Sequence, residues 1–210
     1  FTVKTVTKGK EQNKKILCDQ FGLDITKPLF VFIGRLVGEK AADILPAAIR
    51  TAIYQTQGNA CFLILGSGET SIEWELQQMT NEYQGIYNAY IGYNEQLSHL
   101  IYAGADFLLM PSRVEPCGLN QMYAMRYGTV PVVRSTDGLK DTVTDMGDTD
   151  GFGIRFNNAT IDDLAYSIGR GVSVYQDKKH MEWMRKYMMQ IDHSWESTVS
   201  EYRQVYQSLK

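Results

Sequence analysis

The chain has 210 residues, of which 44% are hydrophobic, and a formal net charge of −3. This length is enough for one large domain with a substantial core, and the charge argues against a broad nucleic-acid-binding face, which needs clustered Lys and Arg. No apolar run approaches the roughly 20 residues that cross a bilayer, and residues 1–9 lack the apolar core of a signal peptide, so we expect a cytoplasmic protein without nucleic-acid or membrane partners.

The three cysteines, Cys18, Cys61 and Cys117, are widely spaced and form no CxxC motif. This pattern suits neither a disulfide framework nor a zinc site, so we expect reduced thiols and no metal. Cys117 has no evident partner for nucleophilic catalysis. The three histidines, His99, His180 and His193, are scattered along the sequence, so we assign structural roles to these histidines. Because the chain starts at Phe1 rather than Met, we expect it to be part of a longer protein.

The first elements are a lead-in, a helix and a buried strand. Residues 1–9 are polar with a β tendency, and residues 10–21 are typical of a modest amphipathic helix. Residues 29–33 form a near-continuous apolar run, which is typical of a strand buried on both faces of a parallel sheet. Asp43 is then expected to cap the next helix, with Pro46 in its first turn.

Strands and helices alternate from there on. Further strands are expected at residues 61–65, 87–91, 107–110 and 130–133, a short one within 152–156, and helices at 73–83, 95–102, 120–127 and from Thr160 onward. This alternation predicts an α/β fold with a Rossmann-like, doubly wound parallel sheet and a C-terminal helical layer. We divide the chain into a lead-in segment and helix (1–27), a ligand-binding core (28–160) and C-terminal helices (161–210).

The stretch from Pro111 to Leu119 reads PSRVEPCGL and joins an expected strand to an expected helix. In open α/β sheets, ligands bind at the carboxyl ends of strands, and the first turn of the following helix offers N–H groups with a partial positive charge. An anionic ligand therefore fits this loop. Glu115 would repel a phosphate, so we expect it to hold an uncharged, hydroxyl-rich part of the same ligand, such as a phosphate-bearing sugar.

Other strand ends carry weaker signals. Arg35 and Lys40 follow the expected strand at residues 29–33, in a segment with Gly34 and Gly38, and they are either a cationic cradle or solvated loop charges. The sequence Gly66-Ser67-Gly68 lacks the third glycine of the dinucleotide fingerprint, so it is either a tight turn or a ligand contact. Tyr93 is either a packing aromatic or a flat platform for a base.

Four motifs together resemble a known family. They are Gly34-Arg35-Leu36 with Glu39-Lys40, Ile91-Gly92-Tyr93, Pro111-Ser112-Arg113 through Glu115-Pro116-Cys117-Gly118-Leu119, and Tyr127-Gly128-Thr129-Val130-Pro131 leading to Gly138-Leu139. The chain resembles the C-terminal half of bacterial glycogen synthases and plant starch synthases, which are retaining glycosyltransferases with the two-domain GT-B fold. The resemblance covers essentially the whole chain, and the third motif is highly specific.

The resemblance implies a role for each matching residue. Arg35 and Lys40 grip the diphosphate of a nucleotide-sugar donor, Glu115 holds the hydroxyls of the transferred glucose, and these three form the implied catalytic set. Tyr93 stacks on the nucleobase. The implied donor-binding positions are Gly34, Gly92, Tyr93, Cys117, Gly118, Leu119, Asn120 and Gly138. The implied reaction moves glucose from ADP-glucose or UDP-glucose to the non-reducing end of an α-1,4-glucan with retention and without cofactor or metal, and a stacking Tyr accepts either base.

The sequence departs from the family pattern at several positions. Tyr123 stands where the wider fold family often has a second Glu, which narrows the resemblance to the bacterial and plant branch. Asp137 replaces a glycine, so either a carboxylate lies near the donor phosphates and weakens donor binding, or its loop lies further away. Ala41 replaces another glycine, which leaves the conformation of that loop open.

The family's N-terminal domain, which supplies most of the glucan acceptor site, is not in these 210 residues. We therefore expect weak donor binding and no transfer by this chain alone. Two alternatives remain. One is the donor-binding domain of another GT-B transferase, and the other is a non-catalytic nucleotide-sugar sensor. The Pro116-Cys117-Gly118-Leu119 motif argues against the first, and the joint presence of Arg35, Lys40 and Glu115 argues against the second.

Overall fold

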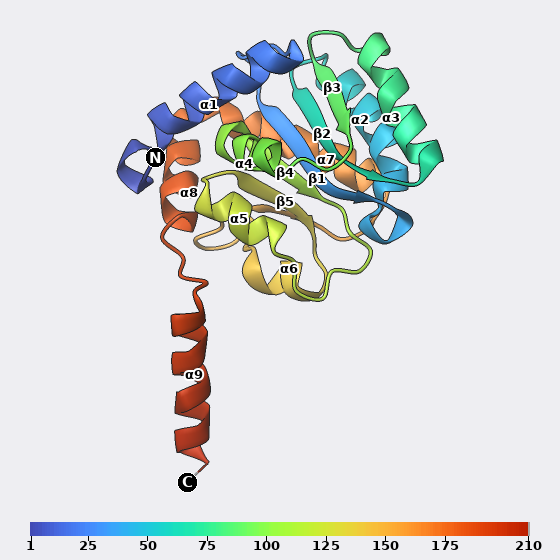
Figure 1. Cartoon of the computed structure of the whole chain (residues 1–210). Helices are drawn as coiled ribbons and strands as arrows, with labels where there is room; N and C mark the ends of the chain where they lie inside the picture. The colour runs from blue at the N-terminus through green and yellow to red at the C-terminus, as the bar shows by residue number, and fades with distance from the viewer. Residues whose placement is uncertain (210) are drawn as a thin grey trace.

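The computed structural model describes residues 1–209. Its centre is a six-stranded sheet with the order β3-β2-β1-β4-β5-β6 (Figure 1), and every neighbouring pair is parallel. The strands are β1 (Leu29–Leu36), β2 (Cys61–Gly68), β3 (Tyr87–Ile91), β4 (Phe107–Met110), β5 (Val130–Arg134) and β6 (Ile154–Phe156). The predicted fold class, a Rossmann-like parallel sheet with flanking helices, is confirmed.

Helices cover both faces of the sheet. They are α1 (Val6–Phe21), α2 (Leu45–Gln55), α3 (Thr70–Glu82), α4 (Glu95–Gly104), α5 (Asn120–Arg126), α6 (Asp137–Thr142), α7 (Ile161–Gln176), α8 (Lys178–Met188) and α9 (Trp195–Ser208), with 3₁₀ turns at Val3–Thr5, Gly38–Lys40 and Ala42–Ile44. Helices α1, α4 and α5 lie over one face, and α2 and α7 pack together on the other (Figure 1). No helix within residues 1–209 has the length and apolarity to span a bilayer.

The sheet core explains why these strands are continuous apolar runs. Phe30 of β1 is aligned with Phe62 of β2 and Phe107 of β4, and its ring stacks on theirs with centroid distances of 5.7 and 4.6 Å. Gly171 of α7 lies against the same layer, since a Cβ there would lie 2.8 Å from Phe30. The central strands are therefore covered on both faces, which is the environment that selects apolar residues at every position.

Two expectations about local structure are wrong. Residues 3–9 are helical rather than β-leaning, because a 3₁₀ turn at Val3–Thr5 leads into α1 at Val6, whose side chain is fully buried, and Phe1 packs against Gly9. Asp43 does not cap α2, since the residue before that helix is Ile44 and makes no side-chain capping bond. Pro46 does lie in the first turn, as expected.

Helix α9 projects away from the rest of the chain (Figure 1), and none of its described residues is buried. Trp195, Tyr202 and Tyr206 are all exposed on it. The last part of the chain therefore contributes no side chain to the core described above.

A buried ion cluster lies at the amino-terminal edge of the sheet. Asp106 directly precedes β4, and its Oδ2 accepts hydrogen bonds from Lys14 Nζ at 2.7 Å and from the Leu29 N–H at 2.9 Å. Its Oδ1 accepts from Arg185 Nη2 at 2.5 Å. Burial alone would raise the pKa of Asp106, but the charges of Lys14 and Arg185 lower it below its ordinary value. One carboxylate thus joins α1, β1, β4 and α8.

Candidate functional site

The predicted site residues gather at the carboxyl edge of the sheet, because all six strands are parallel. The strand order reverses at β1, which lies between β2 and β4, and such a switch point is where open α/β sheets bind ligands. The end of β1 and the turn after it carry Arg35 to Lys40, and the loop after β3 carries Gly92-Tyr93. The loop after β4 carries Pro111 to Leu119, and α6, which follows β5, begins with Asp137-Gly138.

Lys40 and Glu115 form an ion pair at the centre of this edge. Glu115 Oε2 accepts hydrogen bonds from Lys40 Nζ at 2.6 Å and from Ser112 Oγ at 2.9 Å. The side chains of Lys40 and Glu115 are 21% and 11% exposed, so the pair is shielded from bulk water and interacts more strongly than a surface pair. The sequence predicts separate ligand contacts for these residues, phosphate for Lys40 and sugar for Glu115. In the structure the two side chains contact each other directly.

Arg113 and Arg134 fix the loops that carry this pair. The Arg113 guanidinium donates to both carboxylate oxygens of Asp43, with the Nη2 to Oδ2 distance at 2.8 Å, and to the Gly38 carbonyl. Arg134 donates from Nε to the Ser112 carbonyl at 2.7 Å and from Nη2 to that of Arg113. The loop after β1 and the loop after β4 are therefore bound to each other. Neither arginine role was predicted, since each links residues far apart in the sequence.

The Asp137 loop lies against the turn that carries Glu115. Asp137 Oδ2 accepts the Glu115 N–H at 3.2 Å and the Thr136 hydroxyl at 3.1 Å. Its φ is +41°, a left-handed conformation that favours glycine. A Cβ at Gly138 would lie 2.4 Å from the Cys117 carbonyl oxygen, so this position requires a glycine. The Asp137 carboxylate therefore lies beside the Glu115 turn, and its effect on donor phosphates stays a prediction.

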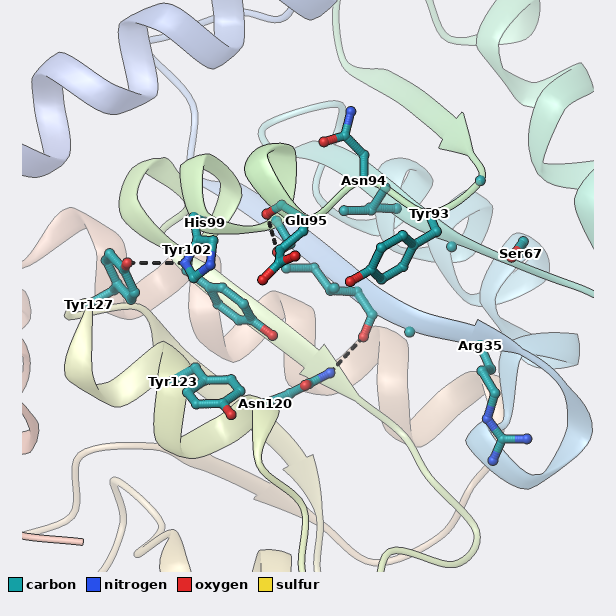
Figure 2. A pocket seen from close by; sticks show the side chains of 16 residues that line it. Arg35, Ser67, Tyr93, Asn94, Glu95, His99, Tyr102, Asn120, Tyr123 and Tyr127 are labelled. Carbon is teal, nitrogen blue, oxygen red and sulfur yellow. Dashed lines mark hydrogen bonds between the residues drawn. The ribbon is translucent and has the colours of Figure 1, made fainter. Parts of the chain in front are cut away.

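A large cavity opens beside the end of β1 (Figure 2). Its volume is about 450 Å³, and aromatic side chains from three segments form its wall: Tyr93, Tyr102, Tyr123, Tyr127 and His99. The Tyr102 ring stacks on that of Tyr127 with centroids 6.1 Å apart and meets that of Tyr123 edge-on at 6.0 Å. Tyr93 stands at the opening and is 84% exposed. The cavity offers flat apolar surfaces with a few polar groups.

A second, smaller cavity of about 170 Å³ adjoins the first. It is lined by Lys40, Ser112, Glu115 and Leu119 among others, and the two cavities share Ile33, Gly34 and Asn120. Asn120 Nδ2 donates to the Ile33 carbonyl at 2.8 Å, which ties the start of α5 to the end of β1. An aromatic cavity and a charged cavity therefore meet at one boundary, an arrangement suited to a ligand with two chemically different halves.

The predicted site residues divide between these features. Gly34 and Asn120 line both cavities. The large cavity is also lined by Gly92, Tyr93 and Arg35, and the small one by Lys40, Glu115 and Leu119. Within residues 1–209, Cys117, Gly118 and Gly138 line neither. Arg35 lines the edge of the large cavity, and its mostly exposed side chain points away from the aromatic wall (Figure 2), with Nη2 3.4 Å from Glu39 Oε1. Arg35 and Lys40 thus lie on opposite sides of the boundary at Gly34.

The sequence missed the aromatic wall contributed by α4 and α5. The sequence places Tyr102 only at the end of an expected helix, assigns His99 a structural role, and marks Tyr123 only as a departure from the family pattern, yet all three line the cavity. His99 Nδ1 lies 3.3 Å from the Tyr127 hydroxyl, so that histidine does belong to the cavity (Figure 2). One signal in the sequence could have identified this wall. These aromatic residues lie on or directly after the helices that follow β3 and β4, and the carboxyl ends of both strands were expected to bind the ligand.

The structure makes a prediction about the thiols. Cys117 is exposed, whereas Cys18 and Cys61 are buried, and burial raises the pKa of Cys18 and raises that of Cys61 to about 11. Because the thiolate is the reactive form, N-ethylmaleimide at neutral pH should modify Cys117 quickly and the other two only after unfolding. Mass spectrometry of peptides after short exposure checks this, with Cys117→Ser as the control that should remove the fast phase. Equal labelling of all three thiols in the folded chain would contradict it.

Comparison with known proteins agrees with this geometry. The fold is that of one half of a GT-B glycosyltransferase. Residues 27–173 match the family described as glycosyl transferases group 1, and the chain belongs to this family.

Particular relatives narrow the class. The chain is 53% identical to the glycogen synthase of Flavobacterium johnsoniae, over 98% of this chain and 43% of that protein, and 44% identical to that of Rhodospirillum rubrum, over 96% and 41%. A solved structure, the catalytic domain of starch synthase IV from Arabidopsis thaliana bound to ADP and acarbose, superposes with a TM-score of 0.86 at 35% identity, covering 99% of this chain and 44% of that one. The chain therefore spans less than half the length of these relatives.

Proposed function

We propose that this chain is the nucleotide-sugar-binding part of a glucosyltransferase that transfers glucose from ADP-glucose or UDP-glucose to the non-reducing end of an α-1,4-glucan with retention. The observation that carries the proposal is the pair of adjoining cavities at the switch point, one aromatic and one holding the Lys40–Glu115 pair. The similarity to glycogen synthases and to a starch synthase bound to ADP supports it.

The aromatic cavity is the proposed base site. Tyr93 stands at its mouth, where an exposed ring can stack on a nucleobase, and the tyrosines of α4 and α5 close the other side. Stacking on a tyrosine does not discriminate adenine from uracil by itself. The polar groups of Asn94, Glu95 and Ser98 also line this cavity, and they can form hydrogen bonds that distinguish the two bases.

The charged cavity is the proposed sugar and phosphate site. The diphosphate would lie near Gly34, between Arg35 on one side and Lys40 on the other, and the backbone N–H groups of Leu119 and Asn120 would contact the ligand. Ligand contacts by Cys117, Gly118 and Gly138, which line neither cavity, stay predictions from the family resemblance. Glu115 would accept hydrogen bonds from glucose hydroxyls. Both of its protein contacts use Oε2, and Oε1 makes no hydrogen bond within residues 1–209.

The chemistry follows from these charges. Breaking the bond between glucose and the diphosphate builds positive charge on the sugar ring and negative charge on the leaving oxygen. Arg35 and Lys40 stabilise the leaving group without a metal ion. Lys40 contributes most, because a fixed cation in a shielded site needs little reorganisation, whereas the Arg35 side chain is mostly exposed. Glu115 stabilises the sugar cation from its place beside the ring. Donor binding exchanges the Lys40–Glu115 contact for contacts of both residues with the ligand.

A calorimetric titration tests the base site. We expect the chain to bind ADP-glucose and UDP-glucose with unequal affinity. Replacement of Tyr93 by alanine should lower the affinity for the preferred donor by about tenfold, since stacking of a base on an aromatic ring contributes roughly 1–3 kcal/mol to binding. Tyr54→Ala is the matched control, because Tyr54 is 86% exposed on α2 and lines no described cavity. Equal weakening by both substitutions, or by neither, would count against this site.

The glucan acceptor is proposed to bind through a domain outside this chain. The chain covers 43% of its glycogen synthase relative from Flavobacterium johnsoniae, so a large part of such an enzyme lies beyond it. We therefore expect the purified chain to incorporate no labelled glucose from ADP-glucose or UDP-glucose into a maltooligosaccharide, above the level seen with its own Glu115→Gln variant. Elongation above that level would show that the chain is sufficient for transfer.

A further inference from the structure

A separate cavity of about 310 Å³ lies at the amino-terminal edge of the sheet, opposite the proposed donor site. It is enclosed by α1, the end of α7 and α8, which lie side by side near the N-terminus (Figure 1). It contains the buried cluster around Asp106 described above. None of its lining residues lines either cavity of the proposed donor site.

The inner wall of this cavity carries more positive than negative charge. Lys10, Lys14 and Arg185 all line it, and the Asp106 carboxylate is shared between Lys14 and Arg185. Lys10 is only 2% exposed, and its Nζ donates to the Tyr102 carbonyl and the Thr129 hydroxyl. Within residues 1–209, no carboxylate lies within ion-pair distance of Lys10.

Two buried groups in this wall, the Lys10 ammonium and the Arg185 Nε, are energetically unfavourable as they stand. Burial, together with the positive charge of Arg185, holds the pKa of the Lys10 ammonium well below its ordinary value. The buried Arg185 Nε also has no hydrogen-bond partner among the described residues. A buried cation without a counter-charge and a buried donor without an acceptor are both unfavourable, and an anion in the cavity would relieve the first through its charge.

The mouth of the cavity adds a further cation. Lys178 Nζ lies 3.4 Å from the centroid of the Tyr175 ring and forms no ion pair within residues 1–209. Two more carboxylates line the cavity. Glu182 is neutralised by Lys186, whose Nζ is 2.6 Å from Glu182 Oε1, and Glu11 is exposed to water at the rim. The free positive charge therefore faces the interior and the mouth.

We propose that this cavity binds an oxyanion of the phosphate class, with Lys178 at its mouth and Arg185 and Lys10 along its inner wall. Inorganic phosphate and the phosphate group of a small monoester share the required chemistry: a tetrahedral, doubly charged acceptor for ammonium and guanidinium donors. The cavity extends from the buried wall to the exposed rim, so it has room for a small substituent on the phosphate.

Thermal unfolding in the presence of phosphate tests the proposal. The melting temperature of the chain is measured against inorganic phosphate and, separately, glycerol phosphate, with chloride at matched ionic strength as reference. We expect a saturable rise of about 2–4 °C, because a ligand that binds only the folded state stabilises it. The ligand with the larger rise at equal concentration identifies the better of the two sources.

Three variants locate the binding. Lys178→Gln should abolish most of the rise, and it is expected to fold because Lys178 is exposed. Lys179→Gln is the matched control, since it removes the same charge from the adjacent exposed position and lines no described cavity, so it should keep the rise. Lys40→Ala should also keep it, because Lys40 lies in the proposed donor site.

Several results would overturn the proposal. They are no rise in the unmodified chain, an equal rise in the chain and in Lys178→Gln, an equal loss in Lys178→Gln and Lys179→Gln, or a loss confined to Lys40→Ala. The last result would place the phosphate in the donor site. The donor titrations of Tyr93→Ala can succeed or fail independently of every one of these outcomes.

Discussion

Replacement of Lys40 by alanine, in a longer protein that contains this chain and transfers glucose, is expected to lower the transfer rate by about 10²–10³-fold, the usual effect of removing one group that stabilises transition-state charge. Lys40 Nζ lies 2.6 Å from Glu115 Oε2 in a shielded cavity. Its removal takes away the proposed phosphate contact and leaves the Glu115 carboxylate without its counter-charge. Initial rates at saturating donor give the measurement.

The control for this prediction is Lys4→Ala. Lys4 is exposed and forms no ion pair among the described residues, so its loss should leave the rate within about twofold of the parent. A Lys40→Ala enzyme that retains more than a tenth of the parent rate would mean that Arg35 and the backbone N–H groups alone stabilise the leaving diphosphate. The assignment of Lys40 would then be wrong.

The second large effect is on stability. Asp106→Asn should lower the free energy of unfolding by about 3–5 kcal/mol, the typical result of removing one partner from a buried ion pair. The substitution leaves Lys14 and Arg185 without their shared counter-charge while keeping the size of the side chain. Urea unfolding monitored by circular dichroism measures the loss, which is a large fraction of the 5–15 kcal/mol typical of a folded protein.

The matched control is Asp19→Asn. Asp19 pairs with Lys15 at 2.7 Å, but both side chains are about two-thirds exposed, at 66% and 65%. An exposed pair one helical turn apart contributes roughly 0.3–0.5 kcal/mol, so this variant should unfold close to the parent. Similar losses for Asp19→Asn and Asp106→Asn would contradict the role assigned to the buried cluster.

The same carboxylate predicts an acid dependence. The pKa of Asp106 is lower in the folded chain than in the unfolded chain, where an ordinary Asp titrates near 3.9. Its stabilising contribution is therefore fully present above that pH and is lost as the pH falls toward the lower folded-state pKa. Asp106→Asn should accordingly show a weaker decrease of stability in acid than the parent, as measured by urea unfolding between about pH 5 and pH 3.

Much of the fold could be predicted because it depends on local patterns. The buried run at 29–33 and the later strands are apolar for a reason visible in the sequence, since both faces of the sheet are covered. The start of α1 could not be predicted in the same way. It depends on Val6 being buried by tertiary packing and on Phe1 lying against Gly9, neither of which residues 1–9 reveal on their own.

The candidate site shows the same division. The loop chemistry at Glu115 and the cations after β1 were evident from residue types and strand ends. Their direct contact was not evident, because the Lys40–Glu115 pair joins positions 75 residues apart. Asp43 was expected to cap a helix, yet its carboxylate holds Arg113. When a side chain has two chemically reasonable partners, the tertiary structure decides which of them it contacts.

The aromatic wall was hidden for a related reason. Tyr102 and Tyr127 have the spacing and hydrophobicity of helix residues that face a core, and they do pack on each other. They become cavity residues only because α4 and α5 leave a space at the end of β1. Periodicity identifies which face of a helix is apolar, but it does not distinguish a filled interior from a cavity.

The central claim is that two adjoining cavities hold the two halves of one donor, and one calorimetric comparison tests it most directly. The affinities of ADP-glucose and ADP, or of UDP-glucose and UDP if that donor is preferred, are measured for the parent chain and for Glu115→Gln. We predict that Glu115→Gln lowers the affinity for the nucleotide sugar by tenfold or more, a loss of about 1.4 kcal/mol of binding free energy. The affinity for the free nucleotide should stay nearly unchanged. Equal weakening of both ligands, or of neither, would contradict the claim that Glu115 holds the sugar.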